Sequence, residues 1–346
     1  MILWRRDPFG FTRQFFHCGG NASGESLRAV LSECPKEHWA IDVQAVAGYR
    51  SGRRLRGRTV VRGVYEVPPG HVLLRSAQGL CTREDLITPA RARLDELLGA
   101  ALHVALERGR RVALALSGGL DSALLLALLR ALGAQEVPVY ILAAEIPGYG
   151  ELPEALDSAQ RLGVTPIVVR VDAQAFTCAL PQAMAHIQEP LYNLHPVAKL
   201  LLAQAMRRDG IEWAISGDGA DQVLGRDRSA DYLPLARVLF SAAGVTLHAP
   251  FLDPAVVAHL LSYPPDPDKR CLRELAARYG VPSRLVAGPK RRTMTPPLPL
   301  GGLLDAERIG ALAQRLGEAP PALTDDAERV HWATLLAVLD ALGVVD

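Results

Sequence analysis

The apolar positions beyond residue 110 fall into two alternating patterns. Short continuous apolar runs, bounded by glycine, proline or charged residues, are typical of buried strands. These runs are residues 111–116, 137–143, 166–171 and 212–215. Helical spacing fills the segments between them, and the helices expected at 122–132 and 152–162 end at Gly133 and Gly163. From Arg228 onward the pattern is mostly helical. Continuous apolar strands separated by helices predict an α/β fold, a parallel sheet with helices on both faces.

The first part of the chain has a different character. It is rich in glycine, arginine and β-branched residues, and two strand-like runs, 59–65 and 70–74, flank a turn at 67–70. Helical spacing begins shortly afterwards. We therefore predict a small β-rich region over residues 1–87 and a larger α/β domain over residues 88–346.

Composition narrows the classes of partner. Lys and Arg total 38 and Asp and Glu total 37 among 346 residues, so the formal net charge is +1. This balance gives no general field for nucleic acid or an anionic membrane, and we expect neither as a partner. The five cysteines include no C-x-x-C pair, which argues against a zinc site or a redox pair. No stretch reads as a signal peptide or a membrane span, so we expect a soluble, cytoplasmic protein.

A glycine-rich loop, residues 117–122, lies where the strand 111–116 turns into the next helix. At such a turn the backbone N–H groups and the helix dipole favour an anion, and Gly118 and Gly119 let the main chain approach it closely. The carboxylate of Asp121 makes sense beside a phosphate if a divalent cation lies between them. The loop lacks the Gly-Lys-Ser/Thr of a Walker A motif. The loop therefore predicts a phosphate site with a metal. The simpler alternative is a plain glycine-rich turn between a strand and a helix.

The loop sequence Ser-Gly-Gly-x-Asp-Ser resembles the pyrophosphate loop of the ATP pyrophosphatase fold, which is adenine-nucleotide α-hydrolase-like. Further segments are similar to asparagine synthetases, in family order over nearly the whole chain. They are residues 6–10, 67–71, 215–222, 249–253, 272–273, Lys269 and Lys290. The chain thus resembles the asparagine synthetase family, and residues 1–87 resemble a truncated form of its N-terminal glutaminase domain.

The resemblance implies a site for ATP and Mg²⁺. Asp121 and Asp221 would hold Mg²⁺ on the phosphates, since two carboxylates with phosphate oxygens and waters satisfy its octahedral geometry. ATP and pyrophosphate would be bound by residues of two strand-end loops and by one lysine. These are Leu116, Ser117, Gly118, Gly119, Asp121, Ser122, Ser216, Gly217 and Lys269.

Two further residues would carry the chemistry. The resemblance implies that Lys290 stabilises developing charge when an amine attacks the acyl adenylate. The alternative is a solvated surface lysine beside Arg291 and Arg292. Asp218 stands where asparagine synthetases usually carry an acidic residue, and it would accept the proton of the attacking amine. It could equally cap its own loop.

Two acidic residues are candidate substrate contacts. Asp253 would orient the substrate or would instead act as the N-cap of a helix over residues 254–261, which its position suits. Glu189 precedes Pro190 at the acidic-Pro position of the family, and the sequence leaves its role open.

The sequence also departs from the family. Glutamine-hydrolysing members begin with a catalytic cysteine directly after the initiator methionine, whereas this sequence has Ile2. The segment 6–10 also lies almost at its start, so we expect an inactive glutaminase-like region without glutamine hydrolysis. Residues 222–226 read Gln-Val-Leu-Gly-Arg instead of Glu-Leu-Phe-Gly-Gly, and the stretch between Arg226 and Pro250 is short for the family. The substrate therefore cannot be carried over from relatives.

We expect an AMP-forming, ATP-dependent carbon–nitrogen ligase. Members without the cysteine, such as β-lactam synthetases and lasso peptide cyclases, attack the adenylate with an amine of the substrate itself. The leading expectation is lactam or macrolactam closure on a small molecule or peptide, with a precursor peptide and its leader protease as partners. The alternatives are ammonia-dependent amidation, sulfur transfer to tRNA, and a non-catalytic scaffold.

Overall fold

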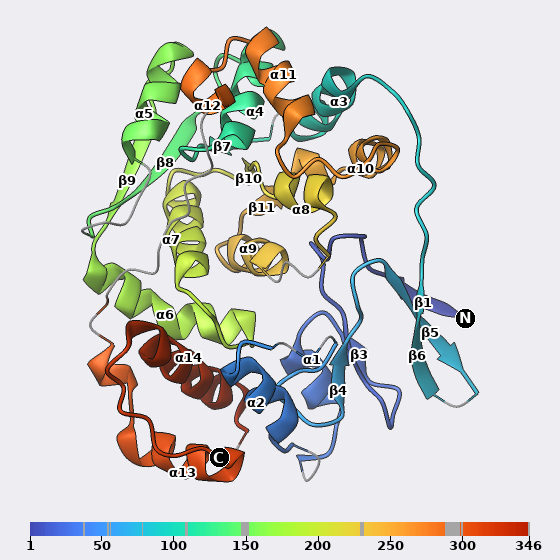
Figure 1. Ribbon diagram of the computed structural model, residues 1–346, viewed down its shortest axis with the longest axis vertical. Coiled ribbons are helices and arrows are strands. Elements are labelled where there is room, and N and C mark those ends of the chain that lie inside the picture. The colour runs from blue at the N-terminus through green and yellow to red at the C-terminus, as the bar shows by residue number, and fades with distance from the viewer. Residues whose placement is uncertain are drawn as a thin grey trace. The chain divides into compact units, whose positions relative to one another are not determined.

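The chain forms two compact units (Figure 1). A computed structural model describes residues 1–344 except 37–38, 54, 56, 78, 108–109, 147–151, 229–231, 288–297 and 299. The first unit comprises residues 1–86, 174–197 and 297–346, and the second comprises residues 87–173 and 198–296. These two units interleave along the chain. The expected domains, 1–87 and 88–346, stay a prediction.

The second unit is built on a five-stranded sheet in the order β11-β10-β7-β8-β9, in which neighbouring strands pair in parallel. The strands are β7 (Val112–Ala115), β8 (Val139–Ala144), β9 (Ile167–Val171), β10 (Trp213–Ile215) and β11 (Thr246–His248). Strand β7 lies between β8, the next strand in sequence, and β10. The strand order therefore reverses between β7 and β10, and open α/β sheets bind ligands at the carboxyl ends of strands at such a point.

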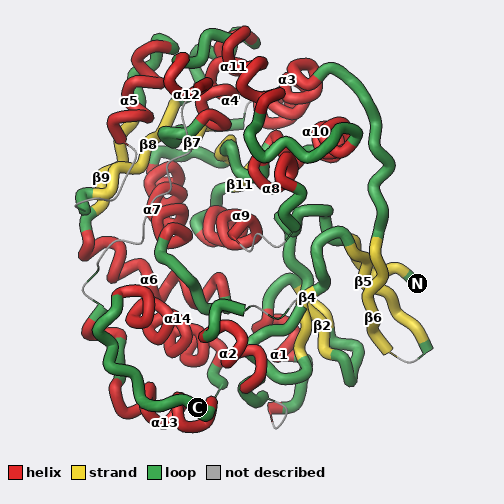
Figure 2. Tube along the Cα trace, in the orientation of Figure 1, coloured by secondary structure: helices red, strands yellow, loops and turns green. Residues whose placement is uncertain are grey.

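Helices lie on both sides of this sheet (Figure 2). Those of the second unit are α3 (Leu94–Leu106), α4 (Leu120–Ala131), α5 (Leu152–Arg161), α8 (Ala220–Gly225), α9 (Tyr232–Ala242), α10 (Pro254–Leu261), α11 (Arg270–Arg278), α12 (Ser283–Ala287) and the 3-10 helix η3 (Pro250–Leu252). Helices α6 (Ala173–Ile187) and α7 (His195–Arg208) each run from one unit into the other. Helix α4 packs against β7, α3 and α11, which explains why it is apolar almost all round.

The first unit holds two small antiparallel sheets. One has the order β1-β5-β6 and the other β3-β2-β4. Their strands are β1 (Ile2–Arg5), β2 (Phe15–His17), β3 (Ser23–Gly24), β4 (Val64–Glu66), β5 (His71–Ser76) and β6 (Gly79–Glu84). The helices are α1 (Leu27–Ser32), α2 (Val43–Arg50), α13 (Ala306–Leu316), α14 (Asp326–Leu342) and the 3-10 helix η4 (Gly301–Leu303). Phe16, Val67, Leu73 and Leu80 form a buried apolar cluster between the strands.

The predicted parallel sheet with flanking helices is confirmed, and strands β7 to β10 lie where the apolar runs placed them. Strand β11 was missed, since only Leu247 of its three residues is buried. The strand expected at 59–65 is wrong over most of its length. There the Thr59 hydroxyl donates to the carbonyls of Val61 and Val64, and Gly63 has a φ of +80°, so the chain turns before β4 begins.

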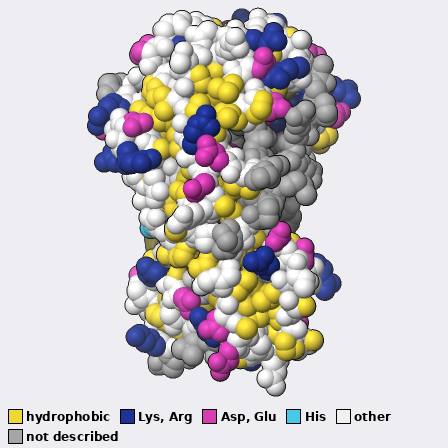
Figure 3. All heavy atoms as spheres, turned by 90° about the vertical axis from the view of Figure 1, so that its left-hand side faces the viewer, with side chains coloured by type: hydrophobic (Ala, Val, Ile, Leu, Met, Phe, Trp, Pro, Cys, Tyr) yellow, Lys and Arg dark blue, Asp and Glu magenta, His cyan; other side chains and the backbone are white. Residues whose placement is uncertain are grey.

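The surface carries charges of both signs. On the face drawn in Figure 3, basic and acidic side chains are interspersed with apolar ones, in keeping with a net charge of +1. Among the helices of the described residues, none has the length and apolar character needed to span a bilayer.

Candidate functional site

Two loops meet at the point where the strand order reverses. Residues 116–119 join β7 to α4, and residues 216–219 join β10 to α8. Because β7 and β10 are parallel neighbours, both loops leave the same edge of the sheet. Helices α4 and α8 therefore begin side by side, each with an aspartate, Asp121 or Asp221, in its first turn.

The first loop is braced from within. The backbone N–H of Ser117 donates to the Ser122 hydroxyl at 3.0 Å, and the two serine hydroxyls lie 3.0 Å apart. The N–H of Gly119 donates to the Ser117 hydroxyl at 3.2 Å. Gly119 is also the N-cap of α4, and it has no side chain that could cover the first helical turn. The loop thus presents backbone and a helix N-terminus, the arrangement that favours an anion.

The second loop contacts the first through Gly217. A Cβ atom at this position would lie 2.9 Å from the Asp121 Cβ and 2.9 Å from the Ser122 backbone nitrogen. Gly219 is constrained as well, since its φ is +95° and a Cβ atom there would lie only 2.4 Å from the Leu252 Cγ. Glycine at both positions lets the loops pack closely enough to bring their aspartates together.

The two aspartates share one lysine. The Lys269 Nζ lies 2.5 Å from Asp121 Oδ2 and 2.8 Å from Asp221 Oδ1, and its side chain is only 10% exposed. Lys269 is the N-cap of α11 and has left-handed backbone angles, φ 56° and ψ 38°. Burial pushes the pKa of Lys269 down, but the two carboxylates outweigh it, so the pKa is raised above its usual value.

This donor set suits a hard divalent cation. Carboxylate oxygens are what Mg²⁺ prefers, and two of them leave positions for phosphate oxygens and water. Among the described residues, no cluster of three or more His, Cys, Asp or Glu side chains could enclose a metal on its own. Asp121 and Asp221 therefore fit a cation that arrives with a phosphate ligand.

Asp218 lies in the second loop and has a partner that the sequence did not indicate. Lys199, on α7, donates to both of its carboxylate oxygens at 3.2 and 2.9 Å, and the Ser216 hydroxyl donates at 2.9 Å. Lys199 belongs to no motif, and only the tertiary fold brings it to this loop. The aspartate is thus held in place as one member of an ion pair, with side chains 17% and 9% exposed for Lys199 and Asp218.

Tyr232, at the start of α9, is a second residue that the sequence did not indicate. Burial and the nearby charges of Asp218 and Asp221 raise the pKa of its phenol well above the usual value. The Asp121 carboxylate acts in the same direction, and a hydrogen bond with the Gln222 side chain acts against it. The phenol therefore stays protonated close to three carboxylates.

The other predicted residues are distributed more widely. Leu116 and Ser216 are buried strand-end residues, whose N–H groups donate to the carbonyls of Tyr140 and His248 at 2.8 and 2.9 Å. Gly118 lies in the first loop. Lys290, the residue predicted to act on the adenylate, lies outside the described residues.

The two candidate substrate residues have structural partners. The Asp253 carboxylate accepts from the N–H of Ala255 at 2.9 Å and is the N-cap of α10, so the capping alternative is confirmed. Glu189 belongs to the first unit and forms an ion pair of 2.7 Å with Arg13, whose side chain is 5% exposed. Its role towards a substrate stays a prediction.

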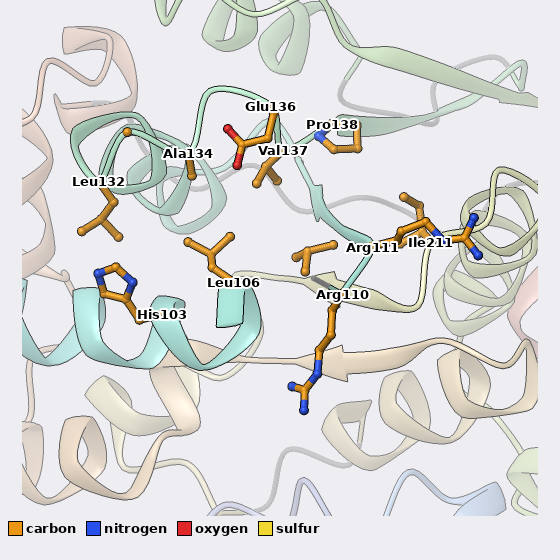
Figure 4. A pocket seen from close by; sticks show the side chains of 12 residues that line it. His103, Leu106, Arg110, Arg111, Leu132, Ala134, Glu136, Val137, Pro138 and Ile211 are labelled. Carbon is orange, nitrogen blue, oxygen red and sulfur yellow. The ribbon is translucent and has the colours of Figure 1, made fainter. Parts of the chain in front are cut away.

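A cavity of about 480 Å³ lies at the opposite edge of the sheet (Figure 4). Arg110 and Arg111 line it just before β7, and Val137 and Pro138 line it just before β8. Since parallel strands carry their ligand sites at their carboxyl ends, this edge is the wrong one for the predicted chemistry. The described lining of the cavity includes no residue predicted to bind nucleotide.

Comparison with known proteins supports the resemblance in the segment that carries both loops. Residues 93–228 match the family described as asparagine synthase. This segment is thus similar to the asparagine synthase domain. The segment includes Asp121, Lys199, Asp218 and Asp221, whereas Lys269 follows it in the sequence.

Individual relatives are distant. The chain is 26% identical to Amidase chyE of Penicillium rubens over 257 residues, 64% of this chain and 37% of that protein. It is 27% identical to a putative glutamine-hydrolysing asparagine synthetase of Mycobacterium tuberculosis over 271 residues, 67% of this chain and 40% of that protein. The chain thus spans about two fifths of the length of these curated relatives. The NMN synthetase structure from Francisella tularensis aligns over 70% of this chain and 91% of its own, with 14% identity and a TM-score of 0.37.

Proposed function

We propose that the protein is an ATP-dependent synthetase that joins a carboxylate to an amine through an acyl adenylate. One observation carries the proposal: Asp121 and Asp221, from neighbouring loops at the switch point of the sheet, share Lys269 beside the glycine-rich loop 117–122. The similarity of residues 93–228 to the asparagine synthase domain supports it independently.

Two steps follow from this proposal. In the first, a carboxylate oxygen of the substrate attacks the α-phosphorus of ATP, and the bond to pyrophosphate breaks. In the second, the amine nitrogen attacks the acyl carbon, AMP leaves, and the amine gives up a proton. Holding both reactants in one site lowers the barrier, since it replaces an encounter between separate molecules.

The side chains divide between these steps. Asp121 and Asp221 would hold Mg²⁺, which neutralises charge on the phosphates. The loop 117–122 and Lys269 would bind the departing pyrophosphate through backbone N–H groups and an ammonium. We assign Asp218 to the proton of the attacking amine, with Lys199 fixing its orientation, and Lys290 to the charge that develops on the adenylate.

A second part of the proposal concerns the class of substrate. We propose lactam or macrolactam closure, in which the amine belongs to the same small molecule or peptide as the carboxylate. A tethered amine outcompetes water once the adenylate forms. A precursor peptide and its leader protease are then the proposed partners. Ammonia-dependent amidation is the second candidate, favoured by the similarity to putative asparagine synthetases.

Pyrophosphate exchange tests the proposal. The protein is incubated with ATP, Mg²⁺, radiolabelled pyrophosphate and a carboxylate, and label is measured in ATP. Exchange is expected with at least one member of a panel that holds free aspartate and peptides with an internal Asp or Glu. Absence of exchange with the whole panel, in a protein shown to be folded, contradicts an adenylating enzyme and favours a scaffold.

Mass spectrometry separates the two substrate classes. A peptide with a free N-terminus and an internal Asp or Glu should give a product lighter by one water, without added ammonium. If product forms only from aspartate with ammonium chloride, the macrolactam proposal is wrong and amidation takes its place.

A further inference from the structure

Lys269 bonds to the two oxygens that the proposed function assigns to a divalent cation. Its Nζ is 2.5 Å from Asp121 Oδ2 and 2.8 Å from Asp221 Oδ1. The ammonium is therefore the positive charge that holds the two carboxylates together. Without a positive charge between them, the two carboxylates would repel one another.

The position of Lys269 is built into the fold. The residue starts α11, and its backbone has the left-handed angles φ 56° and ψ 38°, which are unfavourable for a residue with a Cβ atom. Its N–H donates to the carbonyl of Asp266 at 3.0 Å, and its own carbonyl accepts from the Arg273 N–H at 2.9 Å. The side chain is 10% exposed. Backbone strain held at a functional site is a sign that the side chain it places has a task.

An ammonium and a metal ion cannot use the same pair of oxygens at once. Mg²⁺ binds oxygens at about 2.0–2.1 Å and demands near-octahedral geometry. An ion on Asp121 Oδ2 and Asp221 Oδ1 would lie in the space that Lys269 Nζ fills, and the two positive charges would repel. The lysine therefore has to leave these oxygens before a cation can bridge them.

We propose that Lys269 and the divalent cation bind the carboxylate pair alternately, and that the phosphates of ATP draw the lysine away. This inference rests on the proposed function. The flexible stem of a lysine and its affinity for phosphate as a point charge make the exchange feasible beside the loop 117–122. Cation and nucleotide then bind cooperatively, since each favours the arrangement that the other needs.

Manganese binding provides the test, because Mn²⁺ is a hard cation that can be counted by its electron paramagnetic resonance signal. The protein is titrated with Mn²⁺ alone and with Mn²⁺ plus α,β-methylene ATP, whose α–β linkage resists cleavage. The analogue should tighten Mn²⁺ binding by about 5- to 150-fold, the usual range for coupled sites. Lys269→Gln should tighten Mn²⁺ binding without nucleotide by a factor in the same range and reduce the coupling, of which the direct ligation of the ion by the phosphates remains.

Arg270→Gln is the matched control. It removes one positive charge at the adjacent residue, whose side chain is 79% exposed and pairs with Asp268, and should leave both Mn²⁺ titrations unchanged. Equal Mn²⁺ affinity of the wild type and Lys269→Gln without nucleotide would overturn the inference. So would tight binding of Mn²⁺ by the wild type without the analogue, and that second result remains available if Lys269→Gln does not fold.

These outcomes differ from failure of the proposed function. If Mn²⁺ binds no form of the protein even with the analogue, the metal–nucleotide site is absent and both proposals fall. If the analogue tightens Mn²⁺ binding by the same factor in the wild type and in Lys269→Gln, the site stands and only the alternation of Lys269 is wrong.

Discussion

Gly217 lies where the loop after β10 meets the first turn of α4. A Cβ atom there would lie 2.9 Å from both the Asp121 Cβ and the Ser122 backbone nitrogen, closer than real contacts allow. The neighbours are backbone and a Cβ, which cannot rotate away. The spacing between the two aspartates therefore depends on one missing methyl group.

Gly217→Ala should push the two loops apart. Overpacking of this kind typically destabilises a protein by about 1–3 kcal/mol. We also expect pyrophosphate exchange to fall by at least about tenfold, because loops pushed apart hold the metal and the phosphates less tightly. A loss of about 1.4 kcal/mol in that binding is a factor of ten. Exchange and urea unfolding of the variant measure the two effects.

Gly225→Ala is the control for that variant. Gly225 ends α8 and has open space where a Cβ would go. This substitution should leave exchange intact and keep or raise the free energy of unfolding, since Gly→Ala favours a helix by about 0.5–1 kcal/mol. Equal loss of exchange in both variants would mean that loop contact at Gly217 is not the cause.

Asp221→Asn tests the carboxylate pair directly. The change keeps the size of the side chain and removes the charge that binds Lys269 and the proposed cation. We expect exchange to fall by at least about 100-fold, the scale seen when an electrostatic group at a reacting centre is removed. Asp268→Asn, at a 74% exposed aspartate, should retain wild-type exchange. Wild-type exchange in Asp221→Asn would remove this residue from the site.

At the scale of elements, the start of α10 shows why an aspartate in a sequence can be interpreted in two ways. Asp253 follows η3 and begins α10, and its carboxylate accepts from the Ala255 N–H at 2.9 Å. The same carboxylate was a candidate for substrate contact. Capping accounts for its present hydrogen bond, and helix starts commonly use Asp in this way.

Asp253→Ala should therefore act on stability. Loss of an N-cap costs about 0.5–2 kcal/mol, measurable as a lower urea midpoint. Asp253→Ser, which can still cap, should recover most of that loss. Pyrophosphate exchange should persist in both variants. If exchange is lost in Asp253→Ser while stability is retained, the carboxylate contacts the substrate after all.

The elements near the sheet were predictable because their signals are local. Strands β7 to β10 are runs of buried residues, and the loop 117–122 sits at a strand–helix junction that periodicity alone locates. Strand β11 gave no such signal, since it has three residues and one buried side chain. Lys199 and Tyr232 also gave none, because the residues they face are distant in sequence and only the fold joins them.

At the scale of the whole molecule, buried histidines make stability depend on pH. The Nδ1 of His259 accepts from the Ala92 N–H at 3.0 Å, so this ring is neutral in the folded protein. Burial lowers its pKa below 6.5, and Arg91 lowers it further. Burial also lowers the pKa of His248 and of His331.

The direction of this pH dependence follows from the linkage between proton binding and unfolding. Unfolded histidine binds protons near pH 6.5, above the lowered folded pKa, so the neutral ring contributes its full stability above that pH. As pH falls below 6.5 towards the folded pKa, this contribution is lost. The free energy of unfolding by urea should therefore decrease between about pH 7 and pH 5.

His259→Gln should flatten that decrease, because an amide oxygen can accept from Ala92 without titrating. His103→Gln, at an exposed histidine of α3, is the control and should keep the wild-type slope. An unchanged slope in His259→Gln would show that other groups cause the pH dependence.

The interleaving of the two units leads to a prediction about a fragment of the chain. Within the first unit, Tyr49 donates to the carbonyl of Leu191, and Leu191 donates to the hydroxyl of Thr334 at 3.1 Å. Arg13 pairs with Glu189 in the same unit. A fragment of residues 88–346 would lose Tyr49 and Arg13 and expose the segment they cover.

We expect residues 88–346 expressed alone to melt at a lower temperature than the full chain, or to aggregate, as followed by circular dichroism. Co-expression with residues 1–87 should restore a stable complex. A fragment as stable as the full chain would show that the domain division predicted from the sequence is the physical one.

The same interleaving orders events during synthesis. A ribosome adds residues from the N-terminus, and domains generally fold as soon as their residues have emerged. The second unit is complete once residue 296 has left the exit tunnel, whereas the first unit still awaits α13 and α14. The part of the chain that is made first is therefore finished last, and α2 waits for its contact with α13 while the five-stranded sheet takes shape.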